Sequence, residues 1–315
     1  MRRVALIYNP YSGMGSSRHG DAVQDALVTL TEAGIEAAPF ETDGAGSAVN
    51  VARRAVKDGF DTVVACGGDG TMNEALQALA GTEVALGVLP LGTANALANN
   101  LGLGGSPAKA ARLLCQAERV RVPIGRIHTS DAGGNRSARY FTVAAGIGAD
   151  ALFLSRMNPA LKRRIGYALY MIEGFRVWAT HSFPLFEASF ANGSGAPRVE
   201  QISQLLAIRV SDFGGVLRKF APGAMLESNS LHLIAFSTRR RLDYLSFLMA
   251  VILGRQSFSR NVHLIQANWV ECRPCNGFPR DIIAEADGEV LGNLPVRIEI
   301  VPDGVTLLIP PGARA

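Results

Sequence analysis

The first third of the chain alternates short apolar runs with segments of helical periodicity. The apolar runs cover residues 4–8, 35–40, 62–66 and 84–89, and helical patterns follow them at 21–33, 47–58, 72–80 and 94–101. This alternation is typical of βαβ units on a parallel sheet. Ligands of such sheets bind at the carboxyl ends of the strands. We therefore expect an α/β domain whose ligand site lies along one edge of the sheet.

After about residue 120 the pattern changes to shorter apolar runs separated by Gly, Asn and Ser. This pattern is typical of antiparallel sheets, and it covers residues 140–145, 205–210, 231–236, 296–300 and 305–309. Helical patterns interrupt it at 161–178 and 242–253. We predict an α/β domain over residues 1–125 and a β-rich domain over 126–302. Residues 303–315 either end the second domain or return to the first.

Composition excludes several classes of protein. Apolar residues make up 48% of the chain and charged residues 18%, a balance typical of a globular enzyme. The net charge of +4 is too small to indicate a nucleic-acid partner, although it is compatible with an anionic membrane surface. The longest apolar stretch, residues 244–253, is about half of the roughly 20 residues that a membrane span requires. The first apolar run is too short for a signal peptide. We expect a cytoplasmic protein with peripheral membrane contact at most.

Two other patterns are too incomplete to support a function. Cys272 and Cys275 form a CxxC pair, but no second pair accompanies it, and we predict no zinc site. Gly13-Met14-Gly15 resembles the start of a dinucleotide-binding motif, but Arg18 stands where the third glycine is required. A nicotinamide-dependent oxidoreductase is therefore disfavoured.

The strongest local signal is Gly67-Gly68-Asp69-Gly70-Thr71, which lies between a valine-rich strand and a helix. Glycines let the backbone approach phosphates closely, and the helix N-terminus favours their negative charge. An aspartate at this position would be repelled by phosphates, so it implies a bridging cation such as magnesium. The alternative is a tight turn in which Asp69 or Thr71 only caps the helix. A second cluster, at residues 90–95, also lies between a strand and a helix.

Five motifs together resemble the diacylglycerol kinase catalytic family, which includes bacterial lipid kinases and sphingosine and ceramide kinases. The motifs are Asn9-Pro10-Tyr11-Ser12-Gly13, the GGDGT block followed by Asn73 and Glu74, LGTAN at 91–95, Gly146-Ile147-Gly148-Ala149-Asp150-Ala151, and Asp287-Gly288-Glu289. The resemblance covers nearly the whole chain. It implies a Rossmann-like parallel-sheet domain joined to a β-sandwich domain, as in NAD kinases and diacylglycerol kinases, with ATP bound between them.

The resemblance also implies which residues bind the nucleotide and its metal. Asp69 would hold the catalytic Mg²⁺ ion, directly or through water. The nucleotide-binding residues would be Asn9, Ser12, Gly13, Thr42, Gly67, Gly68, Asp69, Gly70, Thr71, Met72, Asn73 and Thr93.

The expected reaction moves the γ-phosphoryl group of ATP onto a lipid hydroxyl, with diacylglycerol as the favoured acceptor and phosphatidic acid as its product. A hydroxyl is a poor nucleophile at neutral pH and needs an acceptor for its proton. Of the two carboxylates in Asp287-Gly288-Glu289, we favour Glu289 as that base and Asp287 as its orienting partner, and these roles can be exchanged. The enzyme would meet its lipid transiently at the inner face of the membrane.

Some positions depart from the family pattern. Met14 and Ala96 stand where many relatives have lysine and aspartate. Some relatives bind a structural magnesium at a turn that corresponds to Ser228 and Asn229, and we predict no structural metal here. The departures leave two alternatives open, an NAD kinase-like enzyme and a catalytically degenerate protein that binds nucleotide or lipid.

Two basic clusters stand beside apolar helical segments, at residues 162–164 and 239–241. Such a pattern suits a membrane surface, but it also suits a core-facing helix with a solvated basic turn. The sequence leaves the oligomeric state open, a homodimer included, and it does not identify the lipid.

Overall fold

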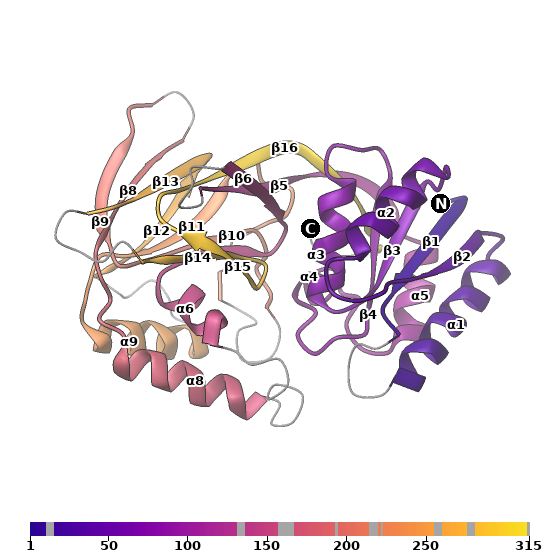
Figure 1. Ribbon diagram of the computed structural model, residues 1–315, viewed down its shortest axis with the longest axis horizontal. Coiled ribbons are helices and arrows are strands. Elements are labelled where there is room, and N and C mark those ends of the chain that lie inside the picture. The colour runs from indigo at the N-terminus through magenta and orange to yellow at the C-terminus, as the bar shows by residue number, and fades with distance from the viewer. Residues whose placement is uncertain are drawn as a thin grey trace.

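The computed structural model forms two lobes, one from each half of the chain, with the long strand β16 (Val296–Ile309) running between them (Figure 1). The structure describes residues 1–10, 16–130, 136–156, 167–192, 195–213, 220–221, 223–254, 260–275 and 281–313.

The first lobe is a parallel sheet with helices on its faces. Its strands lie in the order β2-β1-β3-β4, and all three pairings are parallel. Strands β3 and β4 are buried along their whole length, which explains their unbroken apolar sequences. The strands are β1 (Arg3–Tyr8), β2 (Glu36–Glu41), β3 (Thr62–Gly67) and β4 (Ala85–Pro90). The helices are α1 (Ser16–Glu32), α2 (Ala48–Lys57), α3 (Asp69–Leu79), α4 (Ala96–Asn100) and α5 (Pro107–Cys115).

Two long antiparallel strands connect the lobes. Strand β5 (Glu118–Ser130) pairs with β16 over nearly its whole length, with a register shift between Val301 and Val305. One end of β16 pairs with β4 of the first lobe, and the other pairs with β13 (Trp269–Pro274) of the second lobe. The sheet therefore continues from one lobe into the other. The domain boundary near residue 125 stays a prediction.

The second lobe is a β-sandwich. One layer is the extension of the first sheet through β16, β13 and their neighbours, and the other is a six-stranded sheet in the order β12-β11-β10-β7-β14-β15. Phe186 and Val270 from the first layer share a buried core with Leu205 and Leu233 from the second. The remaining strands are β6 (Arg136–Phe141), β7 (Ala144–Ile147), β8 (Phe186–Ala191), β9 (Arg198–Ile202), β10 (Gln204–Ile208), β11 (Leu231–Phe236), β12 (Val262–Ala267), β14 (Ile283–Ala286) and β15 (Glu289–Asn293). The predicted fold class, a Rossmann-like domain with a β-sandwich domain, is confirmed.

Three helices accompany the sandwich: α6 (Ala149–Arg156), α8 (Tyr167–Thr180) and α9 (Arg241–Ile252). In Figure 1 they lie together on one side of the second lobe. Within the described part of the chain, no helix is both long enough and apolar enough to cross a bilayer.

Candidate active site

Two loops of the first lobe meet at the carboxyl edge of the parallel sheet. The loop after β3 carries the GGDGT block, and the loop after β4 carries LGTAN. The carbonyl of Gly67 accepts a hydrogen bond of 2.9 Å from the backbone N–H of Leu91. A β-carbon on Gly92 would lie only 2.5 Å from the α-carbon of Gly68. Glycine at position 92 therefore lets the two loops touch.

Asp69 fastens the two loops together. Its carboxylate accepts hydrogen bonds from the backbone N–H groups of Asn95 at 3.0 Å and Ala96 at 2.7 Å, which begin helix α4. Asn95 adopts a left-handed backbone conformation with φ of 49°, and its side-chain amide bonds both backbone groups of Gly92. Asp69 thus caps α4, whereas the alternative drawn from the sequence had it cap α3, which begins at Asp69 itself.

The other predicted nucleotide-binding residues occupy different environments. Asn9 is half-buried after β1, Thr42 is buried after β2, and Thr93 is exposed after β4. Met72 and Asn73 are buried in α3, so they offer little surface to a ligand. Gly67 ends β3, Gly68 caps the N-terminus of α3, and Gly70 and Thr71 lie in the first turn of that helix. Ser12 and Gly13 lie outside the described residues.

The Asp287-Gly288 pair is the two-residue turn of the β14–β15 hairpin. Both residues have positive φ, 46° for Asp287 and 86° for Gly288, as the common two-residue hairpin turn requires. The Asp287 carboxylate accepts three backbone N–H groups from the break between β6 and β7, at 2.9 to 3.0 Å: those of Thr142, Val143 and Ala144. The Asp287-Gly288 turn therefore has ordinary hairpin geometry. Its Asp287 carboxylate is also held in one position by the backbone N–H groups.

The environment of Asp287 raises the pKa of its carboxyl group to about 6. Burial is the largest cause, the three backbone N–H donors oppose it, and the negative charge of Asp69 raises the pKa further. The influence of Asp69 places the two aspartates, one from each lobe, within electrostatic reach of each other. A group with this pKa is ionised at neutral pH but binds a proton more tightly than an ordinary aspartate.

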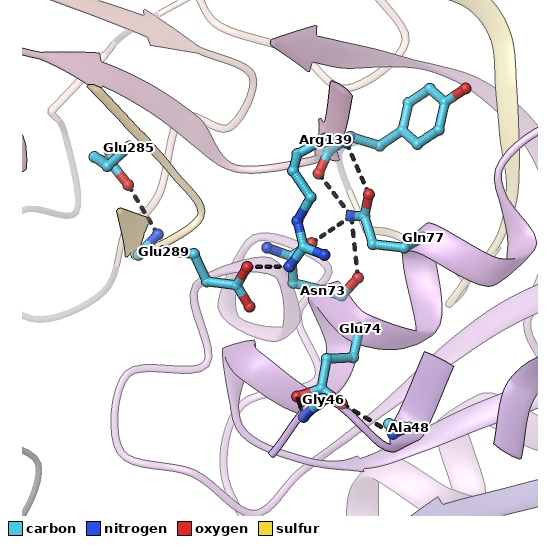
Figure 2. A network of polar contacts seen from close by, with 10 residues as sticks. Gly46, Ala48, Asn73, Glu74, Gln77, Arg139, Glu285 and Glu289 are labelled. Atoms are coloured by element: carbon cyan, nitrogen blue, oxygen red, sulfur yellow. Dashed lines mark hydrogen bonds and ion pairs between the residues drawn. The ribbon is translucent and has the colours of Figure 1, made fainter. Parts of the chain in front are cut away.

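Gln77 of α3 links the first lobe to β6 (Figure 2). Its amide oxygen accepts from the backbone N–H of Tyr140 at 2.9 Å, and its amide nitrogen donates to the Tyr140 carbonyl at 2.9 Å. The same nitrogen donates to the side-chain oxygen of Asn73 at 2.6 Å. Helix α3 begins at Asp69, and β6 leads into the N–H groups that bind Asp287. The Gln77 link therefore connects the helix that carries Asp69 to the strand that precedes the N–H groups bound by Asp287.

Glu289, the predicted base, forms an ion pair with Arg139 of β6, and Figure 2 shows the two side chains pointing toward each other. Both side chains are about one-third exposed. Glu74, the acid of the helix after GGDGT, bonds the backbone N–H groups of Gly46 and Ala48 at the start of α2. Of the two carboxylates in Asp287-Gly288-Glu289, that of Asp287 is held by backbone N–H groups and that of Glu289 by a guanidinium.

A pair of buried acids lies behind the hairpin turn. Oxygens of Asp150 and Glu285 converge on Gly146: a β-carbon there would lie 1.4 Å from the Asp150 oxygen and 2.9 Å from the Glu285 oxygen. Burial raises the pKa of Asp150 to about 6 and raises that of Glu285 well above its usual value, with the Asp150 charge adding to the second shift. Burial and the proximity of the two acids therefore both oppose ionisation of the pair.

This acid pair supports the hairpin turn. The second oxygen of Glu285 accepts from the backbone N–H of Gly288 at 2.9 Å, and Gln204 donates to the second oxygen of Asp150 at 2.6 Å. The pair therefore holds the turn from which Asp287 projects.

The donor set fits a magnesium ion that arrives with a nucleotide. Among the described residues, no group of three His, Cys, Asp or Glu side chains could hold a metal alone. Asp69 supplies a carboxylate, and Mg²⁺ in phosphoryl-transfer sites is commonly held by one or two carboxylates plus phosphate oxygens. Asp69 therefore stays the predicted magnesium residue.

The turn at Ser228 and Asn229 is organised by Arg209. This buried guanidinium donates to the carbonyls of Ser228 and Ser230, both at 2.8 Å, and to those of Pro123 and Leu226. Burial lowers its pKa to about 10, so it remains a cation at neutral pH. The Arg209 guanidinium is therefore the cation that binds these carbonyl oxygens.

Several site residues were missed in the sequence. Glu285 stands two residues before Asp287, and Gln77 stands four residues after Asn73, so strand and helix periodicity could have placed them on the same faces. Arg139 lies in a polar stretch with no motif, and its pairing with Glu289 depends on the fold alone. Asp150 belongs to the Gly146–Ala151 motif, but its burial opposite Glu285 has no local signal.

Comparison with known proteins agrees with both lobes. Residues 3–127 match the family described as "Diacylglycerol kinase catalytic domain", and residues 142–309 match the "YegS C-terminal NAD kinase beta sandwich-like domain". A diacylglycerol kinase of Staphylococcus saprophyticus is 26% identical over 298 residues, which cover 93% of this chain and 91% of that protein. One from Staphylococcus aureus strain bovine RF122 is 31% identical over 179 residues, 56% of this chain and 53% of that one.

A crystal structure of a diacylglycerol kinase from Bacillus anthracis strain Sterne shares the fold. Its TM-score is 0.70 at 17% identity, and the alignment covers 99% of this chain and 98% of that one.

Proposed function

Because the chain belongs to the bacterial lipid kinase family that joins a diacylglycerol kinase catalytic domain to a YegS-type C-terminal domain, we propose that it transfers the γ-phosphoryl group of ATP to a lipid hydroxyl. The proposed acceptor is diacylglycerol and the product phosphatidic acid. The full-length similarity to a diacylglycerol kinase of Staphylococcus saprophyticus supports this acceptor.

One observation supports this function above the others. Gln77 of α3, the helix that begins at Asp69 in the first lobe, bonds Tyr140 of β6, and the residues that follow β6 bind the Asp287 carboxylate of the second lobe. The glycine-rich loops of the first lobe present backbone N–H groups and the start of α3 to phosphates. The hairpin of the second lobe presents a carboxylate of raised pKa to a second substrate. Phosphoryl transfer to a hydroxyl requires both parts.

In the proposed reaction Asp287 accepts the proton of the lipid hydroxyl. The hydroxyl oxygen bonds to the γ-phosphorus, its proton passes to the Asp287 carboxylate, and the bond from the γ-phosphorus to the bridging oxygen of ADP breaks. Asp69 would hold magnesium, which neutralises charge on the phosphates when bound. The backbone N–H groups of residues 142–144 keep the Asp287 carboxylate in position.

This assignment exchanges the roles that we favoured from the sequence. Glu289 pairs with Arg139, and a carboxylate held by a guanidinium has less tendency to accept a proton. We propose that Glu289 and Arg139 together orient the hairpin against β6, while Asp287 is the base.

Incubation of the purified protein with labelled ATP and magnesium, against a panel of acceptors in mixed micelles, tests the function. The panel contains diacylglycerol, a ceramide, a sphingoid base, a glycolipid and NAD. We expect label in organic-extractable lipid, with the highest rate for diacylglycerol.

Two results would contradict the proposal. Label in NADP and none in lipid would indicate an NAD kinase-like enzyme. Binding of magnesium-ATP without label in any acceptor would indicate a nucleotide-binding protein without kinase activity. Asp287→Asn serves as the matched inactive control for each acceptor.

A further inference from the structure

Helix α9 is apolar on the side that faces away from the protein. Phe247 and Val251 are buried in a small core, together with the half-buried Tyr244, whose ring stacks on Phe236 at 4.6 Å. A surface helix normally has polar residues opposite its buried stripe. Here the opposite side consists mainly of apolar side chains that are 40 to 72% exposed: Leu242, Leu245, Leu248, Met249, Ile252 and the following Leu253.

Helix α8 adjoins this surface. The indole N–H of Trp178 donates to the carbonyl of Arg241 at 2.9 Å, which joins the end of α8 to the start of α9. Phe175, which is 67% exposed, lies against Trp178 with ring centroids 5.5 Å apart. Figure 1 shows the two helices next to each other on the outside of the second lobe. We call this surface, formed by Phe175, Trp178 and the exposed apolar residues of α9, the α8–α9 face.

Arginines border the α8–α9 face. Arg176, Arg240 and Arg241 are exposed beside it. Burial lowers the pKa of His181, and the charges of Arg156 and Arg241 lower it further, so the positive charge extends to the end of α6. The basic cluster at residues 162–164 lies outside the described residues.

The acids near the α8–α9 face are already bound to the protein. Glu173 pairs with Arg176 at 3.7 Å, and its side chain is only 14% exposed. Asp243 accepts from the hydroxyl of Thr238 at 2.6 Å and from the amide of Asn261 at 2.8 Å. Three arginines, Arg176, Arg240 and Arg241, against these two acids leave a net charge of +1, so the face presents positive charge to a partner.

The α8–α9 face is connected to the candidate site by one helix. Helix α6 contacts α8 on one side and the β14–β15 hairpin on the other. It begins just after Gly148, and it carries Asp150, which supports the Asp287 turn. A lipid hydroxyl lies at the headgroup level of a bilayer, so a kinase that takes lipid from a membrane needs its site near the docking surface.

We propose that the α8–α9 face docks this protein on an anionic lipid bilayer. The apolar side chains of α9 enter the headgroup boundary, and the surrounding arginines contact lipid phosphates. The docking proposal depends on the proposed function in one respect, because the lipid substrate of that function resides in the bilayer. Vesicle binding itself needs no phosphoryl transfer.

Co-sedimentation of the full chain with vesicles tests the docking. The vesicles contain phosphatidylcholine alone or an equal mixture of phosphatidylcholine and phosphatidylglycerol. We expect binding to the mixed vesicles that weakens with salt, and weaker binding to phosphatidylcholine. Leu248→Glu combined with Met249→Glu should lower the affinity by about 100-fold, because two exposed apolar side chains that would enter the bilayer become charged. Arg240→Glu should lower it by about tenfold.

Val199→Glu is the matched control, since Val199 is 56% exposed on β9, outside the α8–α9 face. This variant should bind vesicles like the wild type, and all variants should keep the wild-type melting temperature. Phosphorylation of a short-chain, monomeric diacylglycerol should remain normal in the Leu248/Met249 variant, whereas phosphorylation of diacylglycerol in vesicles should fall with binding.

Equal vesicle binding by the wild type and the Leu248/Met249 variant would overturn the proposal. A wild-type dimer that this variant dissociates, without vesicle binding by either, would overturn it in favour of a second copy of the chain. Loss of vesicle binding in the variant, together with no lipid phosphorylation by the wild type, would support the docking surface and reject the kinase function.

Discussion

At the scale of single residues, the candidate site combines carboxylates whose environments differ sharply. Asp287 is desolvated beside Asp69, Glu289 pairs with a guanidinium, and Glu285 faces another buried acid. Because proton affinity depends on these surroundings, residues only two positions apart can have different roles. Each role makes a different prediction for pH dependence.

If Asp287 is the base, kcat/KM should fall as the pH decreases through about 6, with a slope of one. Because the pKa of Asp287 is raised to about 6, the ionised carboxylate that acts as base predominates above that pH and is lost below it. Asp287→Asn should lower kcat by about 10² to 10⁴ and change the KM for ATP little. Rates should be compared per folded molecule, because the amide cannot accept all three backbone N–H groups.

Glu289→Gln is the companion variant. The loss of one partly exposed ion pair should cost less than about tenfold in kcat. An inactive Glu289→Gln together with a largely active Asp287→Asn would return the base role to Glu289.

The Asp150–Glu285 pair makes a prediction about stability. The folded state raises the pKa of Asp150 from 3.8 to about 6, so folded protein binds protons more tightly than unfolded protein between these values. Stability therefore falls as the pH rises from about 4 to about 6. Asp150→Asn removes the share of that dependence that Asp150 contributes, keeps an acceptor for Gln204, and should raise the free energy of unfolding above pH 6 by about 2 kcal/mol.

Urea denaturation at pH 4 and pH 7 measures this effect, with the exposed Glu227→Gln as a control that should show none. Destabilisation of Asp150→Asn by the same amount at both pH values would mean that Asp150 serves only as a hydrogen-bond acceptor.

At the scale of elements, the site depends on how α3 is fastened to β6. Gln77→Ala removes four hydrogen bonds, two to Tyr140 of β6 and two to Asn73 within α3. We expect a loss of stability of about 1 to 3 kcal/mol. We also expect about a tenfold lower kcat, because Asp69 and Asp287 would be aligned less well. Gln24→Ala on α1 is the matched control, because Gln24 is exposed. Wild-type rate and stability in Gln77→Ala would show that the lobes are aligned by other contacts.

Regular elements were predictable where one pattern dominates. The four parallel strands and the helix 47–58 lie within one or two residues of their expected positions. The helix at 94–101 shortens to Ala96–Asn100, because left-handed Asn95 and its contact with Gly92 replace the first turn. The strand at 140–145 breaks into β6 and β7, because the N–H groups of residues 142–144 bind Asp287 rather than a neighbouring strand.

Long strands were harder to predict. Strand β5 mixes charged residues and a proline with its apolar residues, and its pairing depends on β16, which lies far away in the chain. The runs 296–300 and 305–309 are one strand, since the register shift near Asp303 accommodates the turn residues between them. Likewise, the site motifs were recognisable from the chain, whereas the Arg139–Glu289 and Asp150–Glu285 pairs depend on long-range packing.

At the scale of the whole molecule, β5 and β16 make the two lobes parts of one sheet. The C-terminal part of β16 supplies Val305, Leu307 and Leu308 to the first-lobe core. Its N-terminal part supplies Val296 and Ile298 to the second core. Unfolding of either core should therefore disrupt a strand that the other core needs. This arrangement keeps the hairpin that carries Asp287 in register with the loops that carry Asp69.

Leu307→Ala tests this coupling. Leu307 is fully buried in the first lobe, and its truncation should cost about 2 to 5 kcal/mol. Both tryptophans, Trp178 and Trp269, belong to the second half of the chain, and Trp269 lies opposite Glu299 of β16. If the lobes unfold together, the urea midpoint by tryptophan fluorescence should decrease by the same amount as the midpoint by far-ultraviolet circular dichroism.

Leu233→Ala, in the second core, should shift both midpoints as well. A fluorescence midpoint that stays at the wild-type value in Leu307→Ala, while the dichroism curve separates into two steps, would show that the lobes fold independently and that β16 only tethers them.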